Sequence, residues 1–453
     1  MSRDLLNDAF NRGNRYLSEI DERRVFPDKA ALSALSGFDE PLSQKGEEPD
    51  KVLEMLDDLG SSATVASAGS RYFGFVVGGS LPVTVGANWI ATAWDQVASS
   101  AVTSPAVDKI ERVASSWLLD VLDLPRNSAV GFVTGATMAT FTALAAARHK
   151  LLNRQGWNVE AKGLFGAPEI KVIVSEEVHV TVLKALSMLG LGKDRVIRIP
   201  TDANGAMDIS HLPELDDSTI VCTQAGNVNS GAFDPIGEIC ERASKSGAWV
   251  HVDGAFGLWV RASKSRAYLA EGVEKADSWA TDGHKWLNTP YDGGVVICRD
   301  VEALYNSMSV SAAYLRDIET AAQNFMPEFS KRARGIEIWA ALKFLGRDGV
   351  DGLISGCCDL ATYFSEGLEG LGLTVLNEVV INQIVVCWNS AEKTESLMQA
   401  VQQEGTCWFG PTVWKGQNAF RLSVSSWKIT KKDIDLSLQA IGNAMTKIEN
   451  EKY

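Results

Sequence analysis

Lys285 and Asp253 are the residues of this chain whose types and positions could do chemistry together. Lys285 lies in the segment 281–286 (TDGHKW), and Asp253 directly follows the apolar run 249–252. A lysine amine can form an aldimine with pyridoxal phosphate, and a carboxylate can keep the cofactor's pyridine nitrogen protonated, which makes the ring an electron sink. An ion-paired surface lysine and a helix-capping aspartate are the alternatives for each residue alone. The pair in these two settings predicts a pyridoxal phosphate site.

A turn of small residues at 134–137 (TGAT) is the candidate phosphate site. It follows the apolar run 128–133 and precedes a long alanine-rich helix. Gly135 and Ala136 leave backbone N–H groups at the positive end of a helix open to a phosphate, and Thr137 can add a hydroxyl. A helix cap with tight packing is the alternative. No Gly-Lys-Ser/Thr follows the turn and no GxGxxG is present, so an ATP or NAD site has little support.

His179 and Asn227 follow two further predicted strands, at 172–174 and 220–222. Open α/β sheets place ligands at the carboxyl ends of their strands, so the His179 ring could stack on a flat cofactor and Asn227 could bind it. A structural histidine and a turn-forming asparagine are the alternatives, and they stay open. No histidine pair has a metal-ligand spacing, and neither a GxSxG nor a Cys/His pattern is present. The sequence therefore predicts no metal centre.

The composition is that of a soluble globular protein. The chain has 453 residues, of which 45% are hydrophobic and 22% charged, and its length predicts two domains plus extensions. A net charge of −14 disfavours nucleic acid and anionic membranes as partners. Seven cysteines without a CxxC or Cys/His spacing favour a reduced, cytoplasmic setting. The start of the chain is acidic, unlike a signal peptide, and no apolar run approaches the ~18 residues that span a bilayer.

The order of elements predicts three regions: a helical arm at 1–60, a large α/β domain at 61–309 and a small α+β domain at 310–453. Short apolar strands alternate with helices between about 128 and 300, which is typical of a parallel sheet with crossover helices. Beyond about 310 the pattern changes to two helices, which end near 346 and 370, and to three strands. These strands are predicted at 373–376, 384–388 and 420–424.

Together these motifs resemble the pyridoxal-phosphate-dependent group II amino-acid decarboxylases, of the aromatic-amino-acid and glutamate decarboxylase type. The resemblance covers nearly the whole chain. It rests on Ser104-Pro105 with Glu111, the turn at 135–137, His179, GAFDP at 231–235, HVD at 251–253 and HKW at 284–286. It implies fold type I of the aspartate-aminotransferase superfamily, which is an α/β fold. We therefore expect a mostly parallel seven-stranded sheet and a smaller C-terminal α+β domain.

The resemblance also implies roles for the residues of the site. Lys285 forms the aldimine, Asp253 pairs with the pyridine nitrogen, and Ala255 and His179 lie on the two faces of the ring. Ala136, Thr137 and His284 hold the phosphate. The full cofactor-binding set is Gly135, Ala136, Thr137, His179, Asn227, Asp253, Ala255, His284 and Lys285, and the catalytic set is Lys285, His179, Asp253 and Tyr314.

Substrate and subunit contacts are implied in the same way. Phe73 and Phe75 fall in the stretch that lines the substrate pocket of the family, and Arg421 lies where superfamily members can engage a substrate carboxylate. Tyr291 lies where the family reaches across a dimer interface, so we expect a homodimer with shared active sites. Further aromatic residues favour an aromatic or large apolar amino acid as substrate, with core packing as the alternative: Tyr72, Trp89 and Trp94.

Two departures from the family pattern bear on the reaction. Asp282 stands where the family has a neutral Asn or Ser near the phosphate, so we expect it to turn away or to be held by a nearby donor. The segment Arg316–Phe329 is shorter than the family's mobile loop and has no tyrosine, so Tyr314 is a candidate proton donor and another acid is the alternative. We expect decarboxylation of an L-amino acid to its amine. Transamination, elimination or aldehyde formation is the alternative, and a non-catalytic protein of this fold is less favoured.

Overall fold

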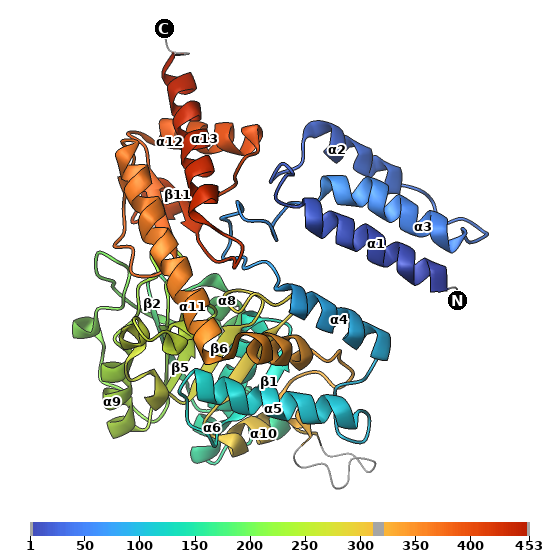
Figure 1. The fold of residues 1–453 in the computed structure, drawn as a ribbon. Helices are drawn as coiled ribbons and strands as arrows, with labels where there is room; N and C mark the ends of the chain where they lie inside the picture. The colour runs from blue at the N-terminus through green and yellow to red at the C-terminus, as the bar shows by residue number, and fades with distance from the viewer. Residues whose placement is uncertain (1–2, 311–320, 451–453) are drawn as a thin grey trace. The chain divides into compact units, whose positions relative to one another are not determined.

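The computed structural model describes residues 3–310 and 321–450, and the chain divides into two compact units. The unit that we call the seven-stranded unit comprises Gly78–Asp359 and Asn377–Gln383. The other, the four-stranded unit, comprises the described residues of Met1–Val77, Leu360–Leu376 and Ile384–Tyr453. Figure 1 shows the elements of both units, coloured along the chain.

The larger sheet has seven strands, of which all but β7 run parallel. Their spatial order is β1-β7-β6-β5-β4-β2-β3, and β7 pairs antiparallel with both β1 and β6. The expected mostly parallel seven-stranded sheet is therefore confirmed. In chain order the strands are β1 (Ala129–Val133), β2 (Lys171–Ser175), β3 (Ile197–Ile199), β4 (Thr219–Gln224), β5 (Trp249–Asp253), β6 (Ser278–Asp282) and β7 (Gly294–Cys298).

The core of this unit lies on both faces of its central strands. Strands β4 to β7 are buried along their whole length, as expected for a sheet that helices cover on both sides, and this is why they appear in the sequence as short apolar runs. Helix α6 (Ala136–Arg154) packs against β1, β5, β6 and β7. Across this interface the Thr140 hydroxyl lies 3.4 Å from His251 Nε2. Burial lowers the pKa of His251 to about 3, so its ring is neutral.

Helices α4 to α10, and α11 as far as Asp359, complete the unit. Ser104 caps α5 by accepting a hydrogen bond from the Val107 N–H, and Pro105 occupies the first turn, which explains the Ser-Pro pair at this point of the sequence. Helix α11 has a non-helical break at Gly346, near the predicted end of one helix and start of another. The bounds are α4 (Pro82–Trp94), α5 (Pro105–Val121), α7 (Val159–Lys162), α8 (Val180–Met188), α9 (Ile236–Ser246), α10 (Val301–Met308) and α11 (Gly335–Gly370).

The four-stranded unit contains a sheet with the order β10-β11-β9-β8. Strands occur near all three predicted positions, and one further strand, β10, was not predicted. It pairs with β11 through a turn at Lys415 and Gly416, both of which have positive φ, as in a two-residue hairpin. The elements are β8 (Thr374–Val375), β9 (Gln383–Cys387), α12 (Ala391–Glu404), β10 (Gly410–Trp414), β11 (Gln417–Ser423) and α13 (Lys431–Asn450).

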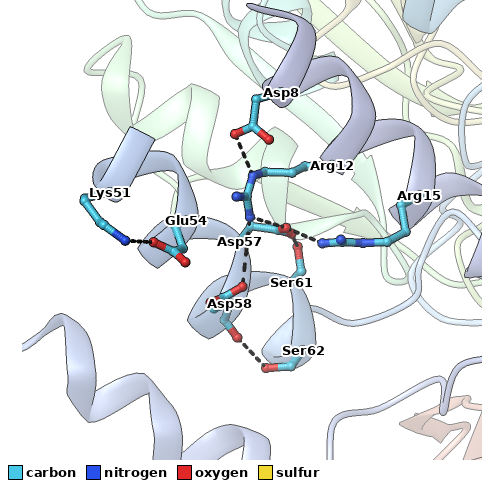
Figure 2. A network of polar contacts seen from close by, with 9 residues as sticks. All are labelled: Asp8, Arg12, Arg15, Lys51, Glu54, Asp57, Asp58, Ser61 and Ser62. Atoms are coloured by element: carbon cyan, nitrogen blue, oxygen red, sulfur yellow. Dashed lines mark hydrogen bonds and ion pairs between the residues drawn. The ribbon is translucent and has the colours of Figure 1, made fainter. Parts of the chain in front are cut away.

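Ion pairs join α1 (Arg3–Glu19) to the π-helical turn Leu56–Ser61 that continues α3 (Pro49–Met55), as Figure 2 shows. Helix α2 (Lys29–Ala34) lies between α1 and α3 in the chain. Arg12 lies 2.9 Å from Asp8 and 3.0 Å from Asp57, and Arg15 also pairs with Asp57. The Ser61 hydroxyl and the two guanidinium groups hold the pKa of Asp57 below its ordinary value. In the described part of the chain, no helix is long and apolar enough to cross a membrane.

The start of β7 packs directly against the turn that precedes α6. Gly294 pairs with Val133 of β1 on one side and with Asp282 of β6 on the other. A Cβ atom added at Gly294 would lie 2.3 Å from the Gly135 Cα, closer than any real contact of this kind. Glycine at 294 therefore allows the turn and the two strands to approach one another.

We predict that Gly294→Ala destabilises the protein, because the added methyl group has to displace the backbone at Gly135. Overpacking of this kind costs about 1–3 kcal/mol. Gly352→Ala is the matched control, since Gly352 is exposed on α11 and a Cβ there would meet no atom within 4 Å. Thermal unfolding should show a lower midpoint for the first variant and an unchanged or higher midpoint for the second. Equal midpoints would contradict the role given to Gly294.

Candidate active site

Three neighbouring strands end in buried polar residues at the same edge of the seven-stranded sheet. Strand β4 ends at Gln224, β5 at Asp253 and β6 at Asp282. In the parallel register Gln224 is the partner of Asp253, and Asp253 is the partner of Ala280 on β6. The three side chains are 3%, 6% and 2% exposed. Because parallel strands present their carboxyl ends together, this edge brings the predicted Asp253 next to the strand that leads to Lys285.

Ala255 joins the ends of β5 and β6. Its N–H donates to Asp253 Oδ1 at 3.2 Å, and its carbonyl accepts from the Asp282 N–H at 3.0 Å. The Gly254 N–H also donates to the Ala280 carbonyl at 2.9 Å. These backbone bonds fix the direction in which the Asp253 carboxylate leaves the strand, and Ala255 lies immediately beside it.

Lys285 lies on the turn that follows β6. Its Nζ is 3.0 Å from Asp282 Oδ2, and its side chain is 21% exposed. The turn is held by the Gly283 N–H, which donates to the Gly293 carbonyl, and by the Thr289 N–H, which donates to the Gly283 carbonyl. A Cβ added at Gly78 would lie 1.9 Å from the Lys285 carbonyl oxygen, so the backbone at Gly78 also packs directly on this turn.

The Asp282 carboxylate points at the start of α6. Its Oδ1 accepts a hydrogen bond from the Ala136 N–H at 2.6 Å, and Oδ2 faces Lys285 Nζ and, at 3.7 Å, His284 Nε2. Of the two alternatives expected for this residue, the one with a nearby donor is confirmed. The positive end of α6 and the lysine ammonium compensate a carboxylate that is otherwise buried.

His284 has a defined orientation. The Gly293 N–H donates to its Nδ1 at 3.1 Å, so in the neutral ring the proton lies on Nε2, the nitrogen that faces Asp282. Burial, together with the nearby Lys285 ammonium, lowers the pKa of His284 and favours this neutral form. Its ring packs on Tyr291, with the ring centroids 4.2 Å apart. His284 is thus a candidate hydrogen-bond donor beside the start of α6.

His179 and Asn227 lie on loops that follow β2 and β4. His179 is the N-cap of α8, and its Nδ1 lies 2.7 Å from the Thr181 hydroxyl. Asn227 is 1% exposed, and its Oδ1 accepts from the N–H groups of Asn229 and Ser230, which is the turn-forming role expected as the alternative. Its Nδ2 has no hydrogen-bond partner among the described residues, so an amide donor remains for a ligand.

Gln224 is a candidate site residue that the sequence reasoning missed. Its Nε2 is buried and also lacks a hydrogen-bond partner within the described structure. Its backbone N–H donates to Asp234, and the Met207 N–H donates to the other oxygen of the same carboxylate. Burial raises the pKa of Asp234 to about 6. A signal was present in the sequence, since Gln224 ends an apolar strand in the same way as Asp253.

The predicted substrate residues belong to the four-stranded unit. Phe73 is fully buried there and packs edge-on against Phe364, with the centroids 5.1 Å apart. Phe75 is 63% exposed beside Trp408. Arg421 lies on β11, where burial lowers its pKa to about 10. Tyr314 lies outside the described residues, as does the first part of the segment Arg316–Phe329.

The residues at this edge fit pyridoxal phosphate. The start of α6 is formed by Gly135, Ala136 and Thr137, the small residues of the predicted turn, and His284 lies beside them; the Ala136 N–H is bonded to Asp282 in this structure. Asp253 ends β5, and Lys285 lies on the turn after the neighbouring strand β6. The buried side-chain amides of Gln224 and Asn227 each have an N–H donor without a hydrogen-bond partner among the described residues. Three or more metal-ligating side chains do not gather anywhere in the described chain.

Comparison with known proteins agrees with this geometry. Residues 33–388 match the family described as the pyridoxal-dependent decarboxylase conserved domain. The chain is 28% identical over 321 residues to an aromatic-L-amino-acid decarboxylase of Bacillus atrophaeus, with 68% of this chain and 65% of that enzyme covered, just under two thirds of its length. It is 27% identical over 379 residues to an L-2,4-diaminobutyrate decarboxylase of Rhizobium meliloti, with 79% and 72% covered.

A solved structure shows the same fold. The crystal structure of Oryza sativa TDC with PLP and tryptamine superimposes with a TM-score of 0.91 at 22% identity, and 98% of each chain is covered.

Proposed function

The chain belongs to the family of pyridoxal-dependent decarboxylases, and we propose that it removes the carboxyl group of an L-amino acid as CO₂ and releases the amine. Its cofactor is pyridoxal phosphate, which when bound supplies the electron sink for the carbon that loses CO₂. The observation that carries the proposal is the junction of β5 and β6, where Ala255 bonds to both Asp253 and Asp282 and Lys285 follows on the next turn.

In this proposal Lys285 and Asp253 act on opposite ends of the cofactor ring. The Lys285 amine would hold the cofactor through its aldehyde carbon. The Asp253 carboxylate would keep a proton on the pyridine nitrogen, and its burial supports this because the attraction between the two opposite charges is stronger where water is excluded. His179 and Ala255 would pack on the two faces of the ring.

The remaining cofactor-binding residues hold the phosphate and the ring substituents. Gly135, Ala136 and Thr137 present the start of α6, and His284 donates from Nε2. Asn227 donates from Nδ2, which is the nitrogen without a partner in the described structure. A cofactor held at several points in this way keeps its reactive carbon in one place relative to the substrate.

Two alternatives to decarboxylation remain to be tested. The first is another reaction on the same cofactor, namely transamination, elimination or aldehyde formation, and the absence of a tyrosine from the segment Arg316–Phe329 motivates it. Tyr314 is the proposed proton donor that would direct the reaction to the amine. A non-catalytic role is less favoured, because a protein that only binds has no need to keep both Lys285 and Asp253.

We propose an aromatic or large apolar amino acid as the substrate. The exposed Phe75 supports this, with Arg421 proposed as the residue that engages the substrate carboxylate, whereas Tyr72 and Phe73 are buried and pack against Trp408 and Phe364. The relatives named above act on aromatic amino acids and on diaminobutyrate, so a screen over the common amino acids is the direct measurement.

The purified protein loaded with pyridoxal phosphate is expected to release amine and CO₂ in equal amounts from one class of amino acid. Lys285→Ala should abolish both the turnover and the visible absorbance of the covalently held cofactor, because the Lys285 amine is the group proposed to hold it. Amine, aldehyde and CO₂ are measured together in this assay. Release of aldehyde, or of a keto acid without CO₂, would replace decarboxylation by one of the rival reactions.

Asp253→Asn is expected to bind pyridoxal phosphate weakly and to turn over at least about a hundredfold more slowly, because the neutral amide no longer holds the ring proton. The rate at saturating substrate, measured with the cofactor in excess, separates the chemical effect from weaker binding. A near-normal rate would mean that another residue holds the pyridine nitrogen.

We also propose that the protein works in the cytoplasm as a homodimer with shared active sites. Helix α4 exposes Trp89, Ile90 and Trp94 by 41%, 52% and 46%, and Leu6 and Phe10 of α1 are 62% and 50% exposed. Apolar patches of this kind are typical of interfaces, and an obligate interface usually exceeds ~2,000 Å². All seven cysteines are buried and free, which agrees with a reducing compartment.

A charge in the exposed face of α4 should separate the subunits. We predict that Trp94→Glu shifts sedimentation towards the monomer and lowers turnover in proportion. Tyr268→Glu is the matched control, since Tyr268 is also an exposed aromatic residue of the same unit, at 69%, but lies away from α4 in the sequence. A monomeric species with full activity would refute the shared active site.

A further inference from the structure

The Asp282 carboxylate makes the contacts that an external anion would make at the start of α6. It accepts the N–H of Ala136, the first residue of the helix, at 2.6 Å, and it lies 3.0 Å from Lys285 Nζ and 3.7 Å from His284 Nε2. A Cβ added at Gly135 would be 3.6 Å from Asp282 Oδ1, so the carboxylate rests against the turn itself. Asp282 is 2% exposed, so its carboxylate is shielded from solvent.

Two of these donors, the Ala136 N–H and His284 Nε2, belong to the proposed phosphate site. A backbone N–H directed at one anion is not available to a second one in line with it. A phosphate placed beside an ionised carboxylate is also repelled, and the repulsion is strong where burial excludes water. A neutral side chain of the same shape at position 282 would accept the Ala136 N–H without this repulsion.

We infer that Asp282 competes with the cofactor's phosphate for the start of α6 and thereby sets how tightly this chain holds its cofactor. The inference rests on the proposed function, because it concerns the same cofactor. Binding requires the carboxylate to give up the Ala136 N–H. The same contact stabilises the protein before the cofactor enters, because it compensates the charges of Asp282, Lys285 and the helix end.

Asp282→Asn removes the charge and keeps the shape, and its amide oxygen can still accept a hydrogen bond from the Ala136 N–H. The variant and the wild type are stripped of cofactor and titrated with pyridoxal phosphate and with pyridoxal, which has the same aldehyde but no phosphate. We expect the variant to bind pyridoxal phosphate about tenfold more tightly or better, and to bind pyridoxal with little change. The stripped variant should also unfold at a lower temperature than the stripped wild type.

Asp300→Asn is the matched control. Asp300 caps α10 by accepting from the Ala303 N–H at 2.9 Å and pairs with Lys150 at 2.6 Å, so it repeats the helix end and lysine of Asp282. Asp300 follows β7, and β7 runs antiparallel to β6. Asp300 therefore lies at the opposite end of the strands from Asp282. The control should lower the unfolding temperature and leave the affinity for both ligands unchanged.

Binding of inorganic phosphate can be measured as well, and it does not involve a covalent bond to Lys285. It should raise the unfolding temperature of stripped Asp282→Asn more than that of the stripped wild type. Asp282→Ser, which also removes the charge, serves as a second variant if the asparagine protein folds poorly, with the same expected order of affinities.

Equal or weaker binding of pyridoxal phosphate by both neutral variants overturns the inference. Equal gains for pyridoxal phosphate and pyridoxal also overturn it, because the charge would then act through Lys285 and not at the phosphate. If the wild type binds pyridoxal phosphate and the variants bind it with the same affinity, the proposed function stands and only the competition is refuted. A wild type that binds no pyridoxal phosphate removes both.

Discussion

Burial of an ionised carboxylate costs several kcal/mol unless hydrogen bonds or cations compensate it, and this protein buries Asp253 and Asp282 at the ends of adjacent strands. The compensation explains much of the local structure. Ala255 donates to the first carboxylate, whereas the end of α6 and Lys285 serve the second. The lysine turn, the start of the long helix and the strand edge are thus held in one arrangement by the need to balance two charges.

Much of this arrangement could be predicted from the sequence because it is local. The apolar run that ends in Asp253 can be recognised from a few neighbouring residues. The same is true of the small residues that begin α6. The mostly parallel sheet follows from their alternation with helices, and the comparisons support the same fold. The lysine and the aspartate were recognisable because residue type and strand position agree at both places.

The parts that could not be predicted depend on contacts between distant segments. The donor for Asp282 is Ala136, far upstream in the chain, and the tautomer of His284 is set by the Gly293 N–H on a returning turn. The free amide of Gln224 appears only once the register with Asp253 is known. The strand at Gly410–Trp414 was missed because a glycine and a proline open it, and these residues usually mark a turn.

Strand β7 lies between β1 and β6 in the sheet, and this determines when the cofactor site can form during synthesis. Strand β1 and the turn before α6 leave the ribosome long before β7, which supplies the wall of that turn at Gly294. Until β7 pairs, β1 lacks its partner and both β1 and β6 present an open edge. The cofactor site is therefore completed late in synthesis, and nascent chains that pause before residue 294 expose strands prone to pair with other chains.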